Sequence, residues 1–411
     1  MTQGINLNNF FSDYIKRESI FKDKKILQSN YDPETIIHRD NEIKQLADIL
    51  APCLKNEKPS NLFVYGKTGT GKTCVIKHII TEIEKISLQN SLNLKFIYLN
   101  CKLKRTADTE YRVIAQICRA LGKEIPITGL PTEEVYNTFH SILESEHRNV
   151  ILVLDEIDEL VKKIGDDILY NLTRINTELK NSQLVLIGIS NNIMFVDTLD
   201  PRVKSSLSEE ELLFNSYNAL QLQDILKKRA LFALRDNNID SGVIEKCAAY
   251  AAREHGDARR AIELLRVSAE LADRANSGKI LLSHLDEAQD KIEKERVIEI
   301  TKSQPRQHQL VLFSILSLCP NNEKNIFTGE AYELYMKLCS KINLRPLTQR
   351  RVSDVISELD MLGVVNAKVI SKGRYGRTRE INLNLSKELL QETRKLLESS
   401  LDIKTSSLSN L

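Results

Sequence analysis

The stretch from residue 60 to residue 73, SNLFVYGKTGTGKT, constrains this chain more than any other. Its first part, Asn61–Tyr65, is a short apolar run with aromatic and β-branched members, which predicts a buried strand. The glycine-rich part that follows fits the phosphate-loop pattern G-x-x-x-x-G-K-[ST]. Apolar residues then recur at helical spacing as far as Ile86. We therefore expect a strand, a loop and a helix in succession.

A loop of this kind binds phosphate because its glycines let backbone N–H groups surround the oxygens, and the helix N-terminus adds partial positive charge. We expect Lys72 to reach the β and γ phosphates of a nucleotide and the Thr73 hydroxyl to hold Mg²⁺. A chance turn is the alternative, and the strand-loop-helix context disfavours it. The residues expected at the nucleotide are Gly66, Lys67, Thr68, Gly69, Thr70, Gly71, Lys72, Thr73 and Cys74.

The composition excludes several classes of protein. With 411 residues, 42% hydrophobic and 28% charged, the chain is an ordinary globular protein of two or three domains. It has no apolar run near the ~20 residues that cross a bilayer. The N-terminus also lacks a signal-peptide layout, so we expect a cytoplasmic protein. The seven cysteines are scattered without a C-x-x-C pair, which argues against a disulfide framework or a zinc site.

Strand-like and helix-like patterns alternate between residues 60 and 217. The alternation predicts an α/β domain in which helices cover both faces of a parallel sheet, with the ligand at the carboxyl ends of the strands. Further strands are expected at Lys95–Cys101, Val150–Leu154, Leu184–Ser190 and Glu211–Phe214, and further helices at Thr109–Leu121 and Ile168–Leu179.

Polar residues follow two of these strands. In ILVLDEID, Asp155 is expected to bind Mg²⁺ through water, and Glu156 to orient and deprotonate the attacking water. An ordinary acidic helix start is the alternative. After the strand in LIGISNN, Asn191 is the preferred candidate to contact the γ-phosphate or the attacking water. Asn192 is the second candidate, and a simple turn asparagine is the alternative to both.

Two arginines complete the candidate site. Arg202 follows a proline in LDPRVKSSL, which we interpret as a surface turn. There it could neutralise transition-state charge on a neighbouring molecule's phosphate, or it could simply be solvated. In HGDARRAIELLR, Gly256 ends one helix and Asp257 caps the next, so Arg259 and Arg260 lie in its first turn. Basic residues there oppose the helix dipole. We therefore expect a bound anion, with Arg259 as its preferred ligand.

Two further domains follow the α/β domain. From residue 218 to about 300 the pattern is helical throughout, which predicts a small all-α domain. After Gln304-Pro305, three helices and two strands predict a winged helix, a variant of the helix-turn-helix. The candidate helices of the all-α domain are Leu222–Arg235, Val243–Arg253, Ala258–Arg274 and His284–Ile300. Those of the winged helix are His308–Leu318, Thr328–Ile342 and Thr348–Leu362, followed by strands Val364–Ile370 and Thr378–Leu383.

The last domain is also the basic one. Residues 303–411 contain 16 lysines and arginines against 11 aspartates and glutamates, although the whole chain carries only +2. An anionic polymer, if the chain binds one, is expected at this end, and an ordinary solvated face is the alternative. The start of its third helix and the glycine-flanked hairpin tip suit base edges, phosphates or a minor groove. A winged helix that contacts protein is the alternative. The candidate DNA-binding residues are Thr348, Gln349, Arg350, Arg351, Lys372, Arg374, Tyr375 and Arg377.

Taken together, the phosphate loop, LVLDEID, ISNN, DPRVKSSL and GDARRA resemble an AAA+ ATPase of the initiator clade. With NYDPETIIHR before the loop and LTQRRVSDVISELDMLG and SKGRYGRTREI after the all-α domain, residues 30–385 are similar to archaeal origin-recognition proteins. That family is related to the largest subunit of the eukaryotic origin recognition complex and to its cell-division-cycle helicase-loading partner. The resemblance implies ATP or ADP with Mg²⁺ as cofactors and slow ATP hydrolysis.

The resemblance also implies roles for individual residues. Asn191 and Arg259 would be the two nucleotide sensors, and Arg202 the arginine finger. The lead-in to the phosphate loop would lie beside the adenine and sugar. A helix near residues 105–121, with Arg105, Arg112 and Arg119, would touch DNA. The lead-in residues concerned are Ile36, Ile37 and Arg39.

The function implied is a replication initiator that binds origin duplex DNA through its winged helix and AAA+ domain and helps to recruit or load the replicative helicase. A related repressor or regulator at origins or promoters is the alternative. A protein-remodelling ATPase is disfavoured by the basic winged helix. We expect a monomer that assembles on DNA with other copies or the helicase, away from membranes. The expected domains are a flexible segment (1–30), the AAA+ base (31–217), the helical lid (218–302), the winged helix (303–395) and a disordered tail (396–411).

Overall fold

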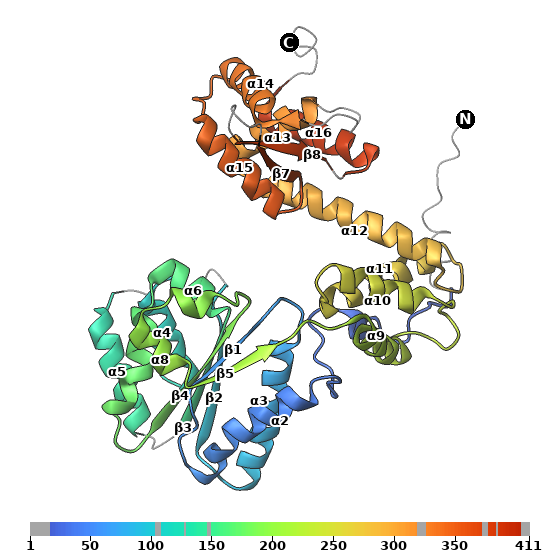
Figure 1. Cartoon of the computed structure of the whole chain (residues 1–411). Coiled ribbons are helices and arrows are strands. Elements are labelled where there is room, and N and C mark those ends of the chain that lie inside the picture. The colour runs from blue at the N-terminus through green and yellow to red at the C-terminus, as the bar shows by residue number, and fades with distance from the viewer. Residues whose placement is uncertain are drawn as a thin grey trace. The chain divides into compact units, whose positions relative to one another are not determined.

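The computed structural model of the chain describes residues 17–102, 108–126, 129–145, 149–318, 326–371, 377–383 and 385–403. It divides into two compact units, Met1–Leu285 and Asp286–Leu411. The division falls within one long helix, α12 (Leu282–Ser303), which Figure 1 labels. Each unit is described by itself. Within the described part of the chain, no helix combines the length and the apolar character needed to cross a bilayer.

The first unit is built on a five-stranded sheet with the strand order β2-β3-β4-β1-β5. All neighbouring strands pair in parallel, which confirms the fold class. Each strand lies within one residue of its expected bounds. The strands are β1 (Leu62–Gly66), β2 (Leu94–Asn100), β3 (Asn149–Asp155), β4 (Gln183–Ser190) and β5 (Glu210–Phe214).

Helices cover both faces of this sheet, as Figure 1 shows. Along β3, Ile151 and Val153 belong to the core shared with α2 and α3, whereas Leu152 and Leu154 belong to the core on the other face. A strand buried on both faces has apolar residues at every position, which explains the run ILVL. The helices are α2 (Asp40–Leu50), α3 (Lys72–Gln89), α4 (Glu110–Ala120), α5 (Thr132–Ser145), α6 (Ile157–Ile164), α7 (Asp167–Arg174) and α8 (Pro201–Leu207).

The structure differs from the expectation in four places of this sheet domain. Helices α5 and α6 were not expected. The helix expected at Ile168–Leu179 is shorter: α7 ends at Arg174, and a 3-10 helix, η3 (Ile175–Thr177), follows it. The segment LDPRVKSSL is the helix α8 rather than a turn. Its reason is local: Asp200 accepts a hydrogen bond from the N–H of Arg202 (2.8 Å), and a proline is the first helical residue.

A helical lid follows β5 in the first unit, as expected. The side chain of Asp257 accepts hydrogen bonds from the N–H groups of Arg259 (2.7 Å) and Arg260 (3.3 Å), so it caps the third lid helix as the sequence predicted. The lid helices are α9 (Ala219–Ala233), α10 (Val243–Arg253), α11 (Ala258–Arg274) and the beginning of α12.

Residues 17–30 pack on the lid, which differs from the loose segment expected there. They include a 3-10 helix, η1 (Lys24–Leu27), in which Leu27 is fully buried. The N–H of Ile20 donates to the carboxylate of Asp273 (2.9 Å), and the N–H of Lys22 donates to the carbonyl of Ala233 (2.8 Å). Buried apolar side chains thus fix this segment to the lid. Residues 1–16 lie outside the described part.

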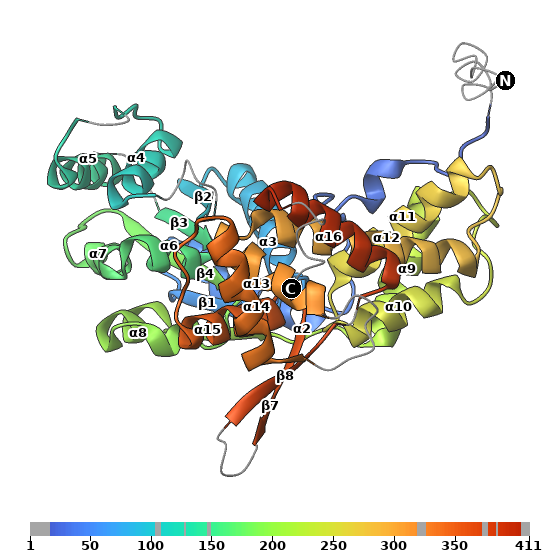
Figure 2. The same ribbon diagram turned by 90° about the horizontal axis from the view of Figure 1, so that it is seen from above.

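The second unit is a winged helix with an antiparallel sheet of order β6-β8-β7. Figure 2 shows β7 and β8 extending side by side beyond the helices of this unit. Helix α16 was not expected, and its buried Leu397 and Leu401 place part of the expected tail in the core. The elements are α13 (Arg306–Leu318), β6 (Ile326–Phe327), α14 (Thr328–Lys341), α15 (Gln349–Met361), β7 (Asn366–Ser371), β8 (Arg377–Asn382) and α16 (Lys387–Leu401).

Candidate functional site

A cavity of about 570 Å³ lies at the carboxyl edge of the sheet in the first unit. Its walls are the loop after β1, the ends of β2 and β3, the residue after β4, the segment before α2 and the lid. Ligands of parallel α/β sheets bind at this edge. The volume is also typical of sites that enclose a small molecule, which are roughly 300–1,000 Å³.

The loop between β1 and α3 depends on glycine. Gly69 and Gly71 have positive φ angles of 72° and 93°. A Cβ added at Gly69 would lie 1.7 Å from a carboxylate oxygen of Asp257 on the lid. The N–H of Ala258 donates to the carbonyl of Gly69 (3.1 Å). The lid therefore contacts the phosphate loop directly, through the first residues of α11.

Lys72 is the central cation of this loop. Its side chain is buried, and its ammonium donates to the carbonyls of Gly66 (2.7 Å) and Lys67 (2.8 Å). Burial lowers the pKa of Lys72 to about 8, and the nearby charge of Asp155 acts in the opposite direction. A buried ammonium held by neutral carbonyls favours an anionic ligand, because phosphate oxygens would form stronger, charge-assisted hydrogen bonds.

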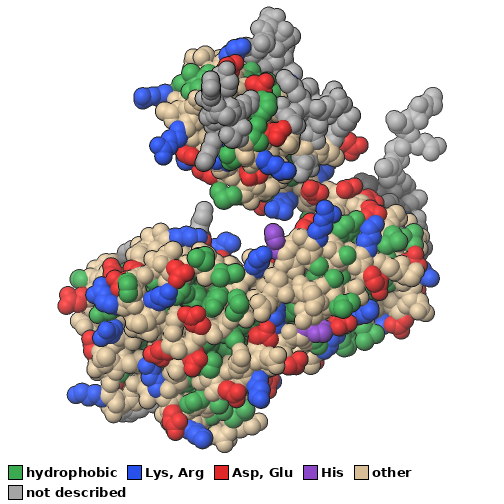
Figure 3. All heavy atoms as spheres, in the orientation of Figure 1, with side chains coloured by type: hydrophobic (Ala, Val, Ile, Leu, Met, Phe, Trp, Pro, Cys, Tyr) green, Lys and Arg blue, Asp and Glu red, His purple; other side chains and the backbone are tan. Residues whose placement is uncertain are grey.

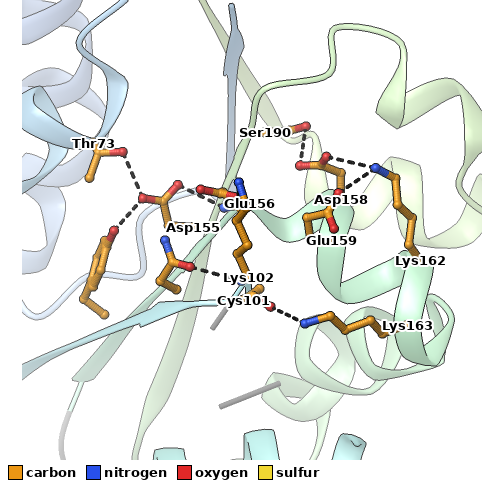
Figure 4. Close-up of polar contacts among 12 residues, drawn as sticks. Thr73, Cys101, Lys102, Asp155, Glu156, Asp158, Glu159, Lys162, Lys163 and Ser190 are labelled. Carbon is orange, nitrogen blue, oxygen red and sulfur yellow. Dashed lines mark hydrogen bonds and ion pairs between the residues drawn. The ribbon is translucent and has the colours of Figure 1, made fainter. Parts of the chain in front are cut away.

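Asp155 ends β3 and has both carboxylate oxygens hydrogen-bonded. Oδ2 accepts from the hydroxyls of Thr73 (2.9 Å) and Tyr98 (2.5 Å), and Oδ1 accepts from the N–H of Glu156 (2.9 Å). Figure 4 shows Thr73 and Glu156 on either side of Asp155. A hydroxyl beside one carboxylate suits Mg²⁺, which takes one or two protein oxygens and completes its shell with phosphate and water. The described residues contain no group of three or more His, Cys, Asp or Glu side chains that could hold a metal ion.

Glu156 and Asn191 also reach the cavity. Glu156 has a left-handed backbone conformation, with φ 56°, and its carboxylate forms an ion pair with Lys102 (3.5 Å). Asn191 lines the cavity, whereas Asn192 does not. The side-chain oxygen of Asn192 instead accepts a hydrogen bond from the N–H of Met194 (3.0 Å) in the following turn. Of the two asparagines, Asn191 is therefore the one placed to contact a ligand.

The two candidate arginines lie in different places. Arg259 lines the cavity from the first turn of α11, and its guanidinium has no partner among the described residues. Its neighbour Arg260 forms an ion pair within the lid. Arg202 does not line the cavity. It is 68% exposed, pairs with Asp200 (3.0 Å) and lies over the ring of Tyr170 (5.2 Å).

Of the remaining candidates for nucleotide binding, some line the cavity and others do not. Ile36, Ile37 and the loop residues from Gly69 to Cys74 line the cavity, and burial raises the pKa of the Cys74 thiol to about 11. Arg39 does not line it. Arg39 is buried, donates to the carbonyl of Thr70 (3.0 Å) and stacks on the ring of Tyr217 (4.0 Å). Arg39 therefore contacts the phosphate loop rather than the cavity. Three loop candidates also do not line the cavity: Gly66, Lys67 and Thr68.

Sequence reasoning missed several cavity residues. Arg229 on α9 donates to the carbonyls of Ile26 (2.9 Å) and Tyr31 (3.2 Å) and lies 4.6 Å over the ring of Tyr31. Burial lowers the pKa of Arg229. No local signal could reveal this clamp, because it joins segments 198 residues apart. Tyr98 was also missed, because it meets Asp155 only through the register of β2 with β3.

The candidate DNA-binding residues of the second unit are only partly described. Thr348 caps α15 by accepting from the N–H of Arg351 (3.4 Å). Gln349 and Arg350 are exposed in its first turn. Arg351 forms an ion pair with Glu358 (3.3 Å), whereas Arg350 has no partner within the described ranges. Arg377 opens β8, its side chain being outside the described part, as are the residues Lys372, Arg374 and Tyr375.

Basic side chains also occur elsewhere on the surface and in the helix that was expected to touch DNA. Figure 3 shows Lys and Arg side chains on the visible face of both units, interspersed with acidic ones. In the helix expected to touch DNA, Arg112 pairs with Asp108 (3.1 Å) and Arg119 donates to the carbonyl of Ile125 (3.1 Å). Arg105 lies outside the described residues. The two described arginines of this helix are thus already partnered within the protein.

Family descriptions match all three parts of the chain. They are an AAA domain at residues 55–193, a Cdc6 AAA+ ATPase-type lid domain at residues 223–290 and a CDC6 C-terminal winged helix domain at residues 299–393. The chain is 51% identical to the ORC1-type DNA replication protein of Thermococcus onnurineus over 92% of both chains. It is 50% identical to that of Pyrococcus horikoshii over 94% of this chain and 93% of the relative.

Solved structures agree. The Aeropyrum pernix ORC1 protein, solved in complex with DNA, has a TM-score of 0.81 and 43% identity, and the match covers 93% of this chain and 98% of that one. Cdc6p from Pyrobaculum aerophilum, at 22% identity and a TM-score of 0.59, shares the fold, with 93% and 99% covered. This chain belongs to the family of ORC1-type DNA replication proteins.

Proposed function

We propose that this chain is an ATP-regulated replication initiator that binds origin duplex DNA and helps to recruit or load the replicative helicase. The observation that carries the proposal is the single cavity where separate segments place six candidate groups, in a member of a DNA replication family. In this proposal, residues 31–217 form the base, 218–302 the lid and 303–395 the DNA-binding domain. The six groups are Lys72, Thr73, Asp155, Glu156, Asn191 and Arg259.

The cavity residues fit ATP with Mg²⁺. Lys72 and the N–H groups at the start of α3 would hold the phosphates, and the Thr73 hydroxyl with Asp155 would hold Mg²⁺. Bound there, the cation would neutralise charge on the β and γ phosphates. Glu156 would orient the attacking water and accept its proton. Asn191 would contact the γ-phosphate or that water from the end of β4.

In this proposal the bound nucleotide acts as a switch through its contact with the lid. Arg259 faces the cavity without a partner, so a γ-phosphate would give its guanidinium a charge-assisted contact. The adjoining N–H of Ala258 already bonds to the phosphate loop. Nucleotide state would therefore change how firmly the lid closes. Slow hydrolysis is what the family resemblance implies. The carboxylate of Glu156, 3.5 Å from the ammonium of Lys102, would accept the proton of the attacking water.

The winged helix supplies the DNA contact of this proposal. The exposed first turn of α15, with Gln349 and Arg350, suits base edges in the major groove. The basic residues toward the tip of the β7–β8 hairpin would contact phosphates or a minor groove. The Aeropyrum pernix ORC1 protein, whose structure was solved with DNA, is the relative that supports this assignment.

Footprinting on the organism's own origins, with ATP and with ADP, tests the proposal. We expect protection of origin sequences over scrambled duplex, and a difference in affinity between the two nucleotides. Protection of promoters together with faster replication after deletion would favour the regulator instead. Equal affinity for origin and scrambled duplex at physiological salt would contradict the initiator function. The Lys72→Ala protein serves as the control for nucleotide-independent binding.

A further inference from the structure

Tyr98 occupies a position in β2 that points to the same face as helix α3. Side chains alternate along a strand, and Ile97 and Leu99 belong to the core on the opposite face of the sheet. The parallel register pairs Asn100 with Asp155, two positions beyond Tyr98. Tyr98 therefore lies beside the end of β3, and it lines the cavity described above.

The hydroxyl of Tyr98 is a donor to Asp155. Its distance to Oδ2 of Asp155 is 2.5 Å, and the Thr73 hydroxyl donates to the same oxygen at 2.9 Å. Burial, and then the hydrogen bond to Asp155, raise the pKa of Tyr98 far above its usual value. The phenol thus keeps its proton at any physiological pH. Asp155 is only 6% exposed, so this donor is not readily replaced by bulk water.

The ring of Tyr98 also contacts helix α3. Lys77 follows Thr73 by one turn of α3, and its ammonium lies 5.4 Å from the ring centroid. The same ammonium is 3.4 Å from the carboxylate of Asp32, in the segment before α2. Tyr98 is 37% exposed, and its direction is set by its position on β2, by its hydrogen bond to Asp155 and by the contact with Lys77 of α3. A donor placed in this way can orient a metal-binding carboxylate.

We propose that Tyr98 is a positioning residue for the divalent cation of the bound nucleotide, acting through Asp155. This inference rests on the proposed ATP site. A threonine hydroxyl has one proton and two lone pairs, so Thr73 can bind the cation through a lone pair and still donate to Oδ2 of Asp155. The Tyr98 phenol is the second donor to that oxygen, and the N–H of Glu156 holds the other oxygen. Without the phenol, Asp155 could rotate away from the cation.

The test measures binding of a fluorescent ATP analogue to the full chain across a titration of MgCl₂, and in EDTA. In Tyr98→Phe we expect the half-saturating Mg²⁺ concentration to rise about tenfold, the low end of what outer-shell partners of metal ligands contribute. Affinity in EDTA should equal that of the wild type, because Tyr98 touches the cation's ligand and not the phosphates. Circular dichroism and the thermal midpoint verify that the variant is folded.

Tyr136→Phe is the matched control. Its hydroxyl also donates to a carboxylate, that of Glu110 (2.6 Å), and burial likewise raises its pKa, but it lies away from the cavity. It should leave both affinities unchanged. An unchanged Mg²⁺ titration in Tyr98→Phe would overturn the inference, and so would an equal loss of affinity in EDTA. Failure of the wild type to bind the analogue would instead overturn the proposed function.

Discussion

The nucleotide cavity of the first unit and the basic start of α15 in the second unit are built in opposite ways. The cavity joins distant segments: Thr73 bonds to Asp155, 82 residues away, and Arg229 bonds to Tyr31, 198 residues away. The start of α15 uses consecutive residues, from Thr348 to Arg351, all exposed to solvent. One site is a property of the fold, and the other is a property of a short piece of sequence.

This difference has an energetic consequence. In the cavity, Lys72 and Asp155 are buried, so removing one partner leaves others unpaired in a place with little water. At the start of α15 the side chains are exposed, so water can replace a lost contact. Substitutions in the cavity should therefore have large and coupled effects. Substitutions on α15 should have smaller effects that depend on salt.

The largest expected effect is that of Lys72→Ala. The ammonium would make charge-assisted hydrogen bonds to two phosphates, at about 2 kcal/mol each, so affinity for ATP should fall roughly 1,000-fold. Isothermal titration with ATP and Mg²⁺ measures it. Retention of wild-type affinity would mean that Lys72 does not hold phosphate, and that substitutions in the buried cavity do not have the large effects expected of it.

Glu156→Gln is the matched control for Lys72→Ala. Glutamine keeps the size of the side chain but cannot take a proton from water. ATP affinity should remain close to that of the wild type while hydrolysis is lost, so the purified variant should accumulate bound ATP. Loss of binding in this variant would show that Glu156 supports the ground state rather than the reaction.

A smaller effect is expected on α15. Arg350 has no partner among the described residues, whereas Arg351 pairs with Glu358. Replacing Arg350 with alanine should cost about 1–3 kcal/mol if it meets a base edge, with relaxed preference at one or two base pairs. Arg351→Ala should cost less, because its charge is already neutralised. Titration of origin and scrambled duplexes at several salt concentrations separates the two; equal losses would show that partnering does not matter here.

The affinity for ATP should depend on pH, because the buried ammonium of Lys72 titrates near neutral pH. Lys72 has a pKa of about 8 instead of 10.5, and bound phosphate would raise it. Above pH 8 the free protein loses this proton while the complex keeps it, so binding takes up a proton. Affinity should then fall as pH rises, by at most tenfold per unit. Fluorescence titration between pH 7.5 and 9.5 measures it. Lys72→Arg stays charged and should remove the dependence.

The sheet and the residues at its strand ends could be predicted from the sequence. Strands buried on both faces appear as continuous apolar runs, and a phosphate loop defines which edge binds ligand. The positions of Asp155 and Asn191 at the cavity follow from this logic, whereas Arg259 was predicted from the helix start at Asp257. Helix α8 was missed although its signal was local, since an aspartate followed by a proline is a typical helix start.

Other features depend on tertiary contacts that no local pattern contains. Arg39 was expected beside the nucleotide; in the structure it is buried and donates to the carbonyl of Thr70, 31 residues away in the phosphate loop. Residues 17–30 pack on the lid through buried Leu27 and through hydrogen bonds such as that from Arg229 to the carbonyl of Ile26. Tyr98 meets Asp155 only through the register of β2 with β3. Such register is set by the assembled sheet.

The smallest expected effect on a single chain is that of Arg202→Ala, and it tests whether the cavity is complete by itself. Arg202 lies outside the cavity, exposed on α8, so it should change neither ATP affinity nor the basal hydrolysis of an isolated chain. If it serves a neighbour's ATP, mixing should reveal it. Arg202→Ala has an intact cavity and Glu156→Gln an intact Arg202, so the mixture should hydrolyse ATP faster on DNA than either variant alone. A loss of basal hydrolysis in dilute Arg202→Ala protein would contradict the role in trans, because no neighbour is present.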